Sequence, residues 1–375
     1  MKGCFLISEM AGVLKKLEIL GRRTLHRALV PGWSSGEVPE SVPDDRLQRI
    51  LILRQDRIGD MIMTLPLIRR IRELYPGIRT GIVASEYNRI ILKYETELDV
   101  ITYRKNPGGF ISSLVEARNF NPDAAVDMHM HDSTTSFIYA LSSGARWKLH
   151  IDRENSLPFN IRVKAPQDGH IMDAFAGLLS GLGRKVETVG LNREITLSKE
   201  ETGFAEDFWN RSGILPGDCV AVNISAGGEN RRWGTGRYAR VCSCILDLGL
   251  KPLILHLPSD FEAACAVHLS EPGALVSPVT PSILHLAALI RGVTMLVSPD
   301  TSVIHLAASC GIPVVGMYLP FDPSLPRWYP WDVKSEVLMA SDHISLDSIT
   351  PEMVSEAVRT LVSDTVYGVQ QDPDQ

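Results

Sequence analysis

The sequence predicts an α/β protein with a doubly wound parallel sheet in each of two halves. Short apolar runs at 50–53 and 295–297 and a mostly apolar segment at 220–225 are each followed by a loop and then by a helical pattern. Such runs are typical of parallel strands that are buried on both faces, and their alternation with helices indicates βαβ units. Further strands are expected at 79–84, 124–130 and 251–257.

The chain divides into two predicted domains and two shorter segments. A chain of 375 residues is long enough for two domains with sizeable cores. Residues 46–195 are expected to form the first Rossmann-like domain and residues 196–350 the second, whose first helix is predicted at 199–212. Residues 351–375 are expected to form a C-terminal helix and a polar tail. Residues 1–45 are predicted to be a basic amphipathic extension and a linker.

Composition and charge argue against several classes of protein. The formal net charge of −6 disfavours a nucleic-acid binder whose affinity depends on neutralising phosphates. The six cysteines form no Cys-x-x-Cys pair, which favours free thiols in a reducing compartment. The absence of a G-x-G-x-x-G fingerprint disfavours a nicotinamide oxidoreductase, and no Walker A loop is present. We therefore expect no cofactor and no nucleic-acid partner.

The segment Asp300-Thr301-Ser302 lies where a predicted strand ends and a short helix begins. A helix N-terminus at the carboxyl end of a parallel strand is a ready anion site, because its N–H groups are unpaired and the helix dipole is positive there. Open α/β sheets bind their ligands at this edge. The alternative is that Asp300 or Thr301 only caps the helix.

Gly59 and Asp60 follow the first predicted strand in the same way. Glycine permits a tight turn close to a ligand. Asp60 is either an N-cap worth about 1 kcal/mol or a carboxylate that takes a proton from a substrate hydroxyl. Because Pro66 interrupts the helical pattern, the regular helix is predicted to begin at Thr64.

A loop with many hydrogen-bond donors follows the strand at 220–225. Gly227-Gly228 allows close approach of a ligand to the backbone, and Arg231 and Arg232 offer charged donors to phosphate oxygens. A solvated surface turn is the alternative for the arginine pair. Trp233 is predicted to plug the loop onto the core rather than to stack on a base.

Several other polar residues have two interpretations each. His129 and His131 share a face if they lie on a strand, which is compatible with metal binding, but contact with an acceptor sugar is the preferred use of His129 and no metal site is predicted. His305 is expected to be a core histidine bonded to the backbone. Asp260 or Glu262 is a candidate for a ribose hydroxyl of a nucleoside.

Together these segments resemble glycosyltransferase family 9, the ADP-heptose:lipopolysaccharide heptosyltransferases. The resemblance extends from about Arg49 to about Leu361 and rests on motifs in the same order along the chain. The matching residues are Arg54, Asp56-Arg57-Ile58-Gly59-Asp60, Thr64-Leu65-Pro66, Gly227-Gly228, Arg231-Arg232-Trp233, Asp300-Thr301 and His305-Leu306-Ala307-Ala308. The resemblance implies a glycosyltransferase-B fold, in which two Rossmann-like domains face a cleft and the helix near 351–361 returns to the first domain.

The family also implies an activity and residue roles. The activity is inverting transfer of a sugar, with heptose as the first expectation, from a nucleotide-diphosphate donor such as ADP-heptose to a lipopolysaccharide-core or related glycan. Asp60 would be the general base, on the acceptor side with Gly59 and His129, and Asp300 would meet the donor sugar. The expected diphosphate contacts are Arg231, Arg232, Thr301 and Ser302. A non-catalytic nucleotide-sugar-binding protein on the same scaffold is the alternative.

Two residues depart from the family pattern, and the extension adds a question of location. Arg231 replaces a lysine, and Ser302 replaces a glycine.

The family's acceptor is lipid-linked, so the basic extension is expected either to lie on an anionic membrane surface or to pack on the first domain. A cytoplasmic enzyme is expected, with attachment to the inner face of the inner membrane as the peripheral alternative.

Overall fold

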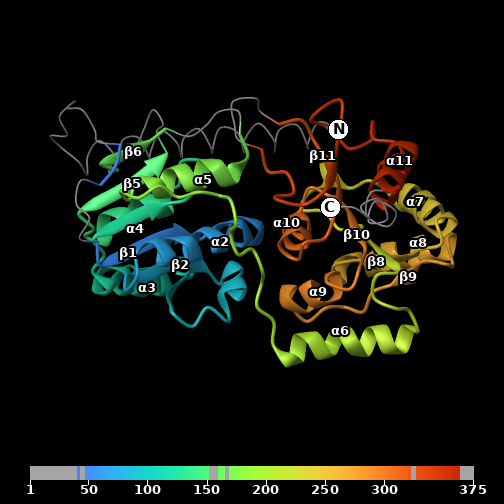
Figure 1. The fold of residues 1–375 in the computed structure, drawn as a ribbon, viewed down its shortest axis with the longest axis horizontal. Coiled ribbons are helices and arrows are strands. Elements are labelled where there is room, and N and C mark those ends of the chain that lie inside the picture. The colour runs from blue at the N-terminus through green and yellow to red at the C-terminus, as the bar shows by residue number, and fades with distance from the viewer. Residues whose placement is uncertain (1–39, 43–46, 152–158, 165–168, 322–326, 364–375) are drawn as a thin grey trace, which may run out of the picture.

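The computed structural model describes residues 40–42, 47–151, 159–164, 169–321 and 327–363. They form two six-stranded sheets side by side, each flanked by helices (Figure 1). All pairings between the strands are parallel. The predicted α/β fold with a doubly wound sheet in each half is therefore confirmed.

The first sheet has the strand order β3-β2-β1-β4-β5-β6. Its strands are β1 (Arg49–Arg54), β2 (Arg79–Ser85), β3 (Leu98–Tyr103), β4 (Ala124–Asp127), β5 (Trp147–Ile151) and β6 (Ile161–Val163). Its helices are α2 (Ile58–Leu74), η1 (Asn88–Leu92), α3 (Pro107–Phe120), α4 (Thr134–Ser142) and α5 (Ile171–Ser180). The order reverses between β1 and β4, so the loops after these two strands flank the crevice at which open α/β sheets bind ligands.

The second sheet repeats this arrangement with the order β12-β11-β10-β7-β8-β9. Its strands are β7 (Cys219–Asn223), β8 (Lys251–Leu255), β9 (Leu275–Val276), β10 (Met295–Pro299), β11 (Val314–Tyr318) and β12 (Ser335–Met339). Its helices are α6 (Lys199–Ser212), η2 (Glu229–Arg231), α7 (Thr235–Asp247), η3 (Pro258–Asp260), α8 (Phe261–Ser270), α9 (Ile283–Ile290), α10 (Ser302–Ser309) and α11 (Pro351–Val362). The reversal between β7 and β10 brings the loops after those strands together.

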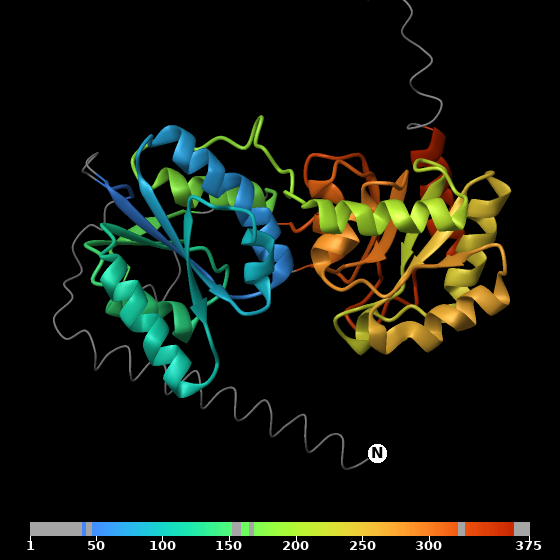
Figure 2. The ribbon, with the colours of Figure 1, turned by 90° about the horizontal axis from the view of Figure 1, so that it is seen from below.

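An extended connection joins the halves. It runs from the end of α5 to α6, which lies along the second half against α9 (Figure 2). The helix predicted at 199–212 is confirmed as α6, with Ser198 as N-cap and Gly213 in the left-handed conformation at its end. The proposed division at residue 195 falls inside this connection.

The predicted start of the first helix is wrong. α2 begins at Ile58 and contains Pro66, although proline leaves the carbonyl of Ile62 without its usual N–H partner. Packing explains why the helix continues: Met61, Leu65 and neighbouring side chains on all sides are buried in the core, which outweighs one lost hydrogen bond.

The predicted path of the C-terminal helix is also wrong. α11 does not cross to the first domain but packs against α7, β11 and β12 of the second half. Its apolar face, which includes Val354, Val358 and Leu361, lies in a cluster of buried apolar side chains within the second half. Burial of these apolar side chains stabilises α11 in this position.

The linker predicted before the first strand contributes a core residue. Val42 is 5% exposed and belongs to the cluster of buried apolar side chains that includes Ile50 and Ile52 of β1. Its N–H donates to the Gly181 carbonyl at 2.7 Å. The linker before the first strand was expected to carry little that could enter a core, and Val42 corrects that expectation. The amphipathic pattern of residues 1–39 lies outside the described residues.

Candidate functional site

The two halves meet where the N-termini of α2 and α10 approach each other (Figures 1 and 2). A Cβ atom placed on Gly59 would lie 2.8 Å from the His305 Cδ2 and 3.4 Å from the Ser302 Cα. The first of these distances is shorter than van der Waals contact allows, so only glycine permits this approach. In the structure Gly59 permits the close approach of α10; that it also permits a turn close to a ligand remains a prediction.

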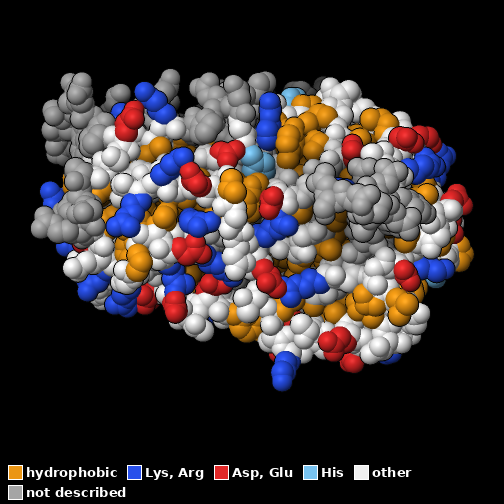
Figure 3. All heavy atoms as spheres, viewed as in Figure 1, with side chains coloured by type: hydrophobic (Ala, Val, Ile, Leu, Met, Phe, Trp, Pro, Cys, Tyr) orange, Lys and Arg blue, Asp and Glu red, His pale blue; other side chains and the backbone are white. Residues whose placement is uncertain are grey.

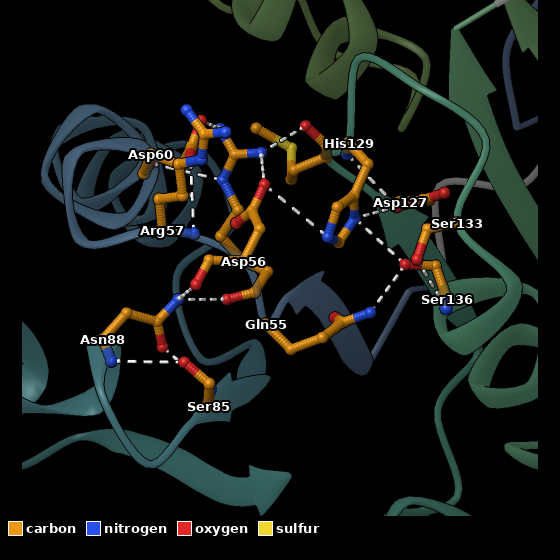
Figure 4. A network of polar contacts seen from close by, with 12 residues as sticks. Gln55, Asp56, Arg57, Asp60, Ser85, Asn88, Asp127, His129, Ser133 and Ser136 are labelled. Carbon is orange, nitrogen blue, oxygen red and sulfur yellow. Dashed lines mark hydrogen bonds and ion pairs between the residues drawn. The ribbon is translucent and has the colours of Figure 1, made fainter. Parts of the chain in front are cut away.

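Asp60 lies in the first turn of α2, beside this contact. Its Oδ2 accepts the backbone N–H of Arg57 at 3.3 Å, and its Oδ1 is 3.7 Å from the Arg54 Nη2 (Figure 4). Burial raises the pKa of the Asp60 carboxyl, while the positive charge of Arg54 lowers it, and the net shift is upward. Arg57, not Asp60, is the N-cap of α2, so the interpretation of Asp60 as the N-cap is wrong; Asp60 is the third residue of the helix, and its carboxylate accepts the N–H of the N-cap residue. Its raised pKa suits a general base.

His129 belongs to a buried chain of charged groups behind Asp60 (Figure 4). Its Nδ1 is 2.6 Å from the Asp127 Oδ1 and 3.0 Å from the Ser136 Oγ, and its Nε2 is 3.6 Å from the Asp56 Oδ2. Burial raises the pKa of Asp127, but its interactions with His129 and His150 outweigh burial and hold that pKa far below the ordinary value. His129 therefore sits between two carboxylates, with its ring fixed.

The metal interpretation of His129 and His131 finds no further ligands. β4 ends at Asp127, so the two histidines do not lie on the strand, and their rings meet edge to face at 5.8 Å. Among the residues that the structure describes, no three His, Cys, Asp or Glu side chains are placed to hold a metal ion.

Asp300 and Arg231 meet on the second half, at the edge where β7 and β10 end. The Arg231 Nη2 is 3.0 Å from the Asp300 Oδ2, and its Nη1 donates to the Asp300 carbonyl at 3.3 Å. Burial raises the pKa of Asp300, and the charges of Arg231 and Arg57 lower it; the net shift is upward. The charge of Arg57 acts on Asp60 as well, so this arginine of the first half is electrostatically linked to both carboxylates.

Thr301 caps α10, as one interpretation predicted. Its side chain accepts the Val303 N–H at 3.3 Å. Ser302 is the first residue of the helix and contacts Gly59. The helix N-terminus thus faces the first half, where its dipole favours an anion.

Arg232 and Asp260 bind each other rather than opening toward a ligand. Arg232 Nη1 donates to the Asp260 Oδ1 at 3.1 Å, and the Ser225 Oγ donates to the Asp260 Oδ2 at 2.6 Å. These bonds fix the loop after β7. Glu262 lies exposed in the first turn of α8. The expected phosphate contact of Arg232 and ribose contact of Asp260 or Glu262 remain predictions.

Trp233 is buried, at 2% exposure, and its Nε1 donates to the Ile349 carbonyl at 2.8 Å. Its ring packs edge to face on Tyr238, with centroids 5.0 Å apart. The prediction that Trp233 plugs the loop onto the core is confirmed.

We expect Trp233→Phe to reduce stability and leave donor affinity almost unchanged. Phenylalanine keeps most of the buried ring but loses the hydrogen bond to Ile349, so the free energy of unfolding should fall by about 1–2 kcal/mol. Denaturant unfolding and calorimetric titration with a nucleoside diphosphate measure the two effects separately. A large loss of affinity at unchanged stability would restore the stacking interpretation.

His305 does not make the predicted backbone bond through Nδ1. That atom is buried and has no hydrogen-bond partner among the described residues. Burial lowers the pKa of His305 to about 4, so the ring is neutral near pH 7. It packs on Trp328 of the same half, with ring centroids 6.0 Å apart, and its Cδ2 edge lies against Gly59 of the first half.

Sequence reasoning gave no role to Arg54, Asp56 or Asp127. Arg54 is a charged residue that follows the four apolar residues 50–53 of β1, and it is fully buried. A charge at that position of a buried strand is costly unless it is paired. The charge of Arg54 in a buried strand was therefore the sequence feature that could have indicated a polar network.

Comparison with known proteins decides the family. The model of glycosyltransferase family 9 (heptosyltransferase) matches residues 122–348, which is more than half of the chain. The chain belongs to glycosyltransferase family 9. Relatives in the family include the lipopolysaccharide core heptosyltransferase OpsX of Haemophilus influenzae, 23% identical over 290 residues that make up 73% of this chain and 80% of OpsX. Lipopolysaccharide heptosyltransferase 1 of Escherichia coli K12 is 20% identical over 332 residues, 84% of this chain and 100% of that protein.

Solved structures of family 9 proteins share the fold. The glycosyl transferase family 9 protein of Veillonella parvula has a TM-score of 0.73 at 21% identity. The match covers 87% of this chain and 99% of the Veillonella chain. The Escherichia coli heptosyltransferase WaaC with ADP has a TM-score of 0.64 at 19% identity, covering 85% and 99%. The expected glycosyltransferase-B fold is confirmed, and the chain is a glycosyltransferase of the heptosyltransferase family. Asp60 precedes the range matched by the family model, so its role is a proposal.

Proposed function

We propose that this family 9 enzyme transfers a heptose from ADP-heptose to a lipopolysaccharide-core glycan, with inversion at the anomeric carbon. The observation that carries the proposal is the meeting of the two halves at Gly59 and Ser302. It places the α2 turn that holds Asp60 against the α10 N-terminus that follows Asp300. The relatives OpsX and lipopolysaccharide heptosyltransferase 1 support the choice of donor sugar and acceptor.

In the proposed reaction, Asp60 accepts the proton of an acceptor hydroxyl. The hydroxyl oxygen forms a bond to the anomeric carbon as the bond from that carbon to the donor phosphate breaks, and the electron pair leaves with the nucleoside diphosphate. The leaving group gains negative charge, and in this proposal Arg231 and the N–H groups at Thr301 and Ser302 stabilise that charge. Asp300 binds hydroxyl groups of the transferred sugar. Closure of the two halves excludes water from the donor.

A donor panel with product analysis tests the proposal. Purified protein is given ADP-heptose or a UDP- or GDP-linked hexose, together with a core acceptor that lacks heptose. We expect mass spectrometry to show one added heptose with ADP-heptose alone, and NMR of the product to show the inverted anomeric configuration. Retained configuration would contradict Asp60 as base. Tight donor binding without any transfer would favour the non-catalytic binding protein.

The N-terminal extension is proposed to hold the enzyme at an anionic membrane. Within the described ranges, no helix is both long and apolar enough to span a bilayer. On the face drawn in Figure 3, acidic and basic side chains are interspersed over both halves. The basic residues of the extension are the proposed attachment site, each adding about 1 kcal/mol near the surface.

Removal of residues 1–39 should abolish cosedimentation with anionic liposomes while activity on a detergent-dispersed acceptor persists. The deletion stops there because Val42 is a core residue. Added salt should weaken binding of the full-length protein, because screening reduces the attraction. Neutral liposomes are the control. Unchanged binding of the truncated protein would place the membrane contact elsewhere.

A further inference from the structure

Arg54 is a fully buried arginine beside Asp60. It is the last residue of β1, and it is 0% exposed. A buried guanidinium is costly unless surrounding groups bind it. The groups around Arg54 therefore show what the protein uses this charge for.

The guanidinium is held from several sides. Nε donates to the Thr64 Oγ1 at 2.9 Å and to the Asp60 carbonyl at 3.3 Å. Nη1 donates to the Met128 carbonyl at 2.6 Å and to the Asp56 Oδ2 at 3.2 Å. The ring of Phe175 lies 4.5 Å from the guanidinium carbon, in cation–π contact. A planar group bound in this way cannot turn without breaking several bonds, so its charge has a fixed position.

One nitrogen of Arg54 is left for Asp60. Nη2 is buried and has no hydrogen-bond partner among the described residues, and the Asp60 Oδ1 lies 3.7 Å from it. The other carboxylate oxygen accepts the Arg57 N–H. The carboxylate of Asp60 is thus held between the fixed cation of Arg54 and the N-terminus of α2.

We propose that Arg54 is a positioning residue for Asp60, which fixes the direction of its carboxylate and keeps it ionised for proton transfer. The proposal rests on the proposed function of Asp60 as the base. Burial alone would favour the protonated carboxyl, which cannot accept a proton. A fixed cation at short range opposes that effect without donating a proton itself, because arginine stays charged.

Other charged groups near Asp60 do not replace Arg54. Asp56 raises the pKa of Asp60, while Arg57 and His129 contribute less than Arg54 to lowering it. From α10, His305 is neutral near pH 7, because burial lowers its pKa to about 4. Loss of Arg54 should therefore leave Asp60 with a higher pKa.

Arg54→Met and Arg54→Lys in the full-length enzyme test the proposal. The carboxyl carbon of Asp60 is followed by NMR against pH in protein labelled at aspartate, with its signal assigned by its absence from Asp60→Asn. In parallel, kcat/KM is measured against pH. Arg79→Met is the control, because Arg79 forms an exposed pair with Asp99 at the opposite end of the sheet.

In Arg54→Met, the Asp60 midpoint should rise by at least about one pH unit, and the acid limb of kcat/KM should rise with it. Arg54→Lys keeps the charge but not the fork of donors, so its acid limb should stay near the wild-type position while kcat falls about tenfold or more. The control should match wild type in both measurements.

Distinct results would overturn distinct claims. An unmoved Asp60 midpoint in folded Arg54→Met would overturn the positioning role. If that variant does not fold, wild-type kcat in Arg54→Lys would overturn it. A midpoint that rises while the acid limb stays fixed would show that Asp60 is not the base, which overturns the proposed function of Asp60 instead.

Discussion

Asp60→Asn is expected to lower kcat by about 10²–10⁴-fold, the usual contribution of a general base. Asparagine has nearly the same shape, and its amide oxygen can still accept the Arg57 N–H that Asp60 accepts at 3.3 Å. It cannot accept the proton of an acceptor hydroxyl. The fold and the affinity for the donor should therefore remain close to those of the wild type.

Steady-state kinetics, thermal unfolding and donor titration on the same preparation separate these effects. Asp99→Asn is the matched control, because it removes an exposed carboxylate that pairs with Arg79. Wild-type turnover in Asp60→Asn would reduce Asp60 to a helix cap. A parallel loss of turnover and of folded protein would show a structural role instead.

The pH dependence of the wild-type enzyme follows from the same environment. Because burial raises the pKa of Asp60 above its ordinary value despite Arg54, the base is protonated, and inactive, up to a higher pH than an exposed aspartate would be. The acid limb of kcat/KM should accordingly lie above the usual range of aspartate.

The sequence was sufficient to predict the elements that depend on local pattern. Apolar runs such as 50–53 became central strands because parallel strands are buried on both faces. The cap at Ser198 and the left-handed Gly213 bounded α6 as predicted. Trp233 was recognised as a plug because a large aromatic residue in a glycine-rich loop needs a buried surface.

The errors arose where distant contacts override local preference. The start of α2 was placed too late, because proline propensity is a local cost and the burial of Met61 and Leu65 is a tertiary gain. The path of α11 could not be predicted, because an apolar face does not reveal which surface it will cover. Val42 was missed for the same reason, since a valine flanked by serine and proline in a polar segment gives no periodic apolar pattern.

The candidate site was predictable in its outline but not in its connections. Asp60, Asp300 and Arg231 were identified because each follows a parallel strand, and the strand order brings such loops together. The contacts that these residues make were not predicted, because the Arg231–Asp300 pair and the approach of Arg54 to Asp60 depend on side-chain positions. Arg54 was therefore named only as part of a motif.

Arg231→Ala is expected to weaken binding of the donor and of free nucleoside diphosphate by about 1.5–3 kcal/mol, the range for hydrogen bonds to a charged group. The Arg231 side chain is 30% exposed and pairs with Asp300 at 3.0 Å. It is therefore oriented at the α10 N-terminus and still open to a ligand. Arg231→Lys should recover much of the affinity, because the family usually has lysine at this position.

Isothermal titration of Arg231→Ala, Arg231→Lys and the control Arg240→Ala decides between phosphate binding and a solvated loop. Arg240 forms an exposed pair with Glu352 at 3.8 Å, so its removal should not change affinity. Loss of Arg231 also leaves the Asp300 carboxylate without its ionic partner. In Arg231→Ala the unpaired Asp300 carboxylate repels the diphosphate. The Asp300→Asn background has no such carboxylate, so the affinity lost on replacing Arg231 by alanine should be smaller there. Wild-type affinity in Arg231→Ala would show that the diphosphate does not contact this arginine.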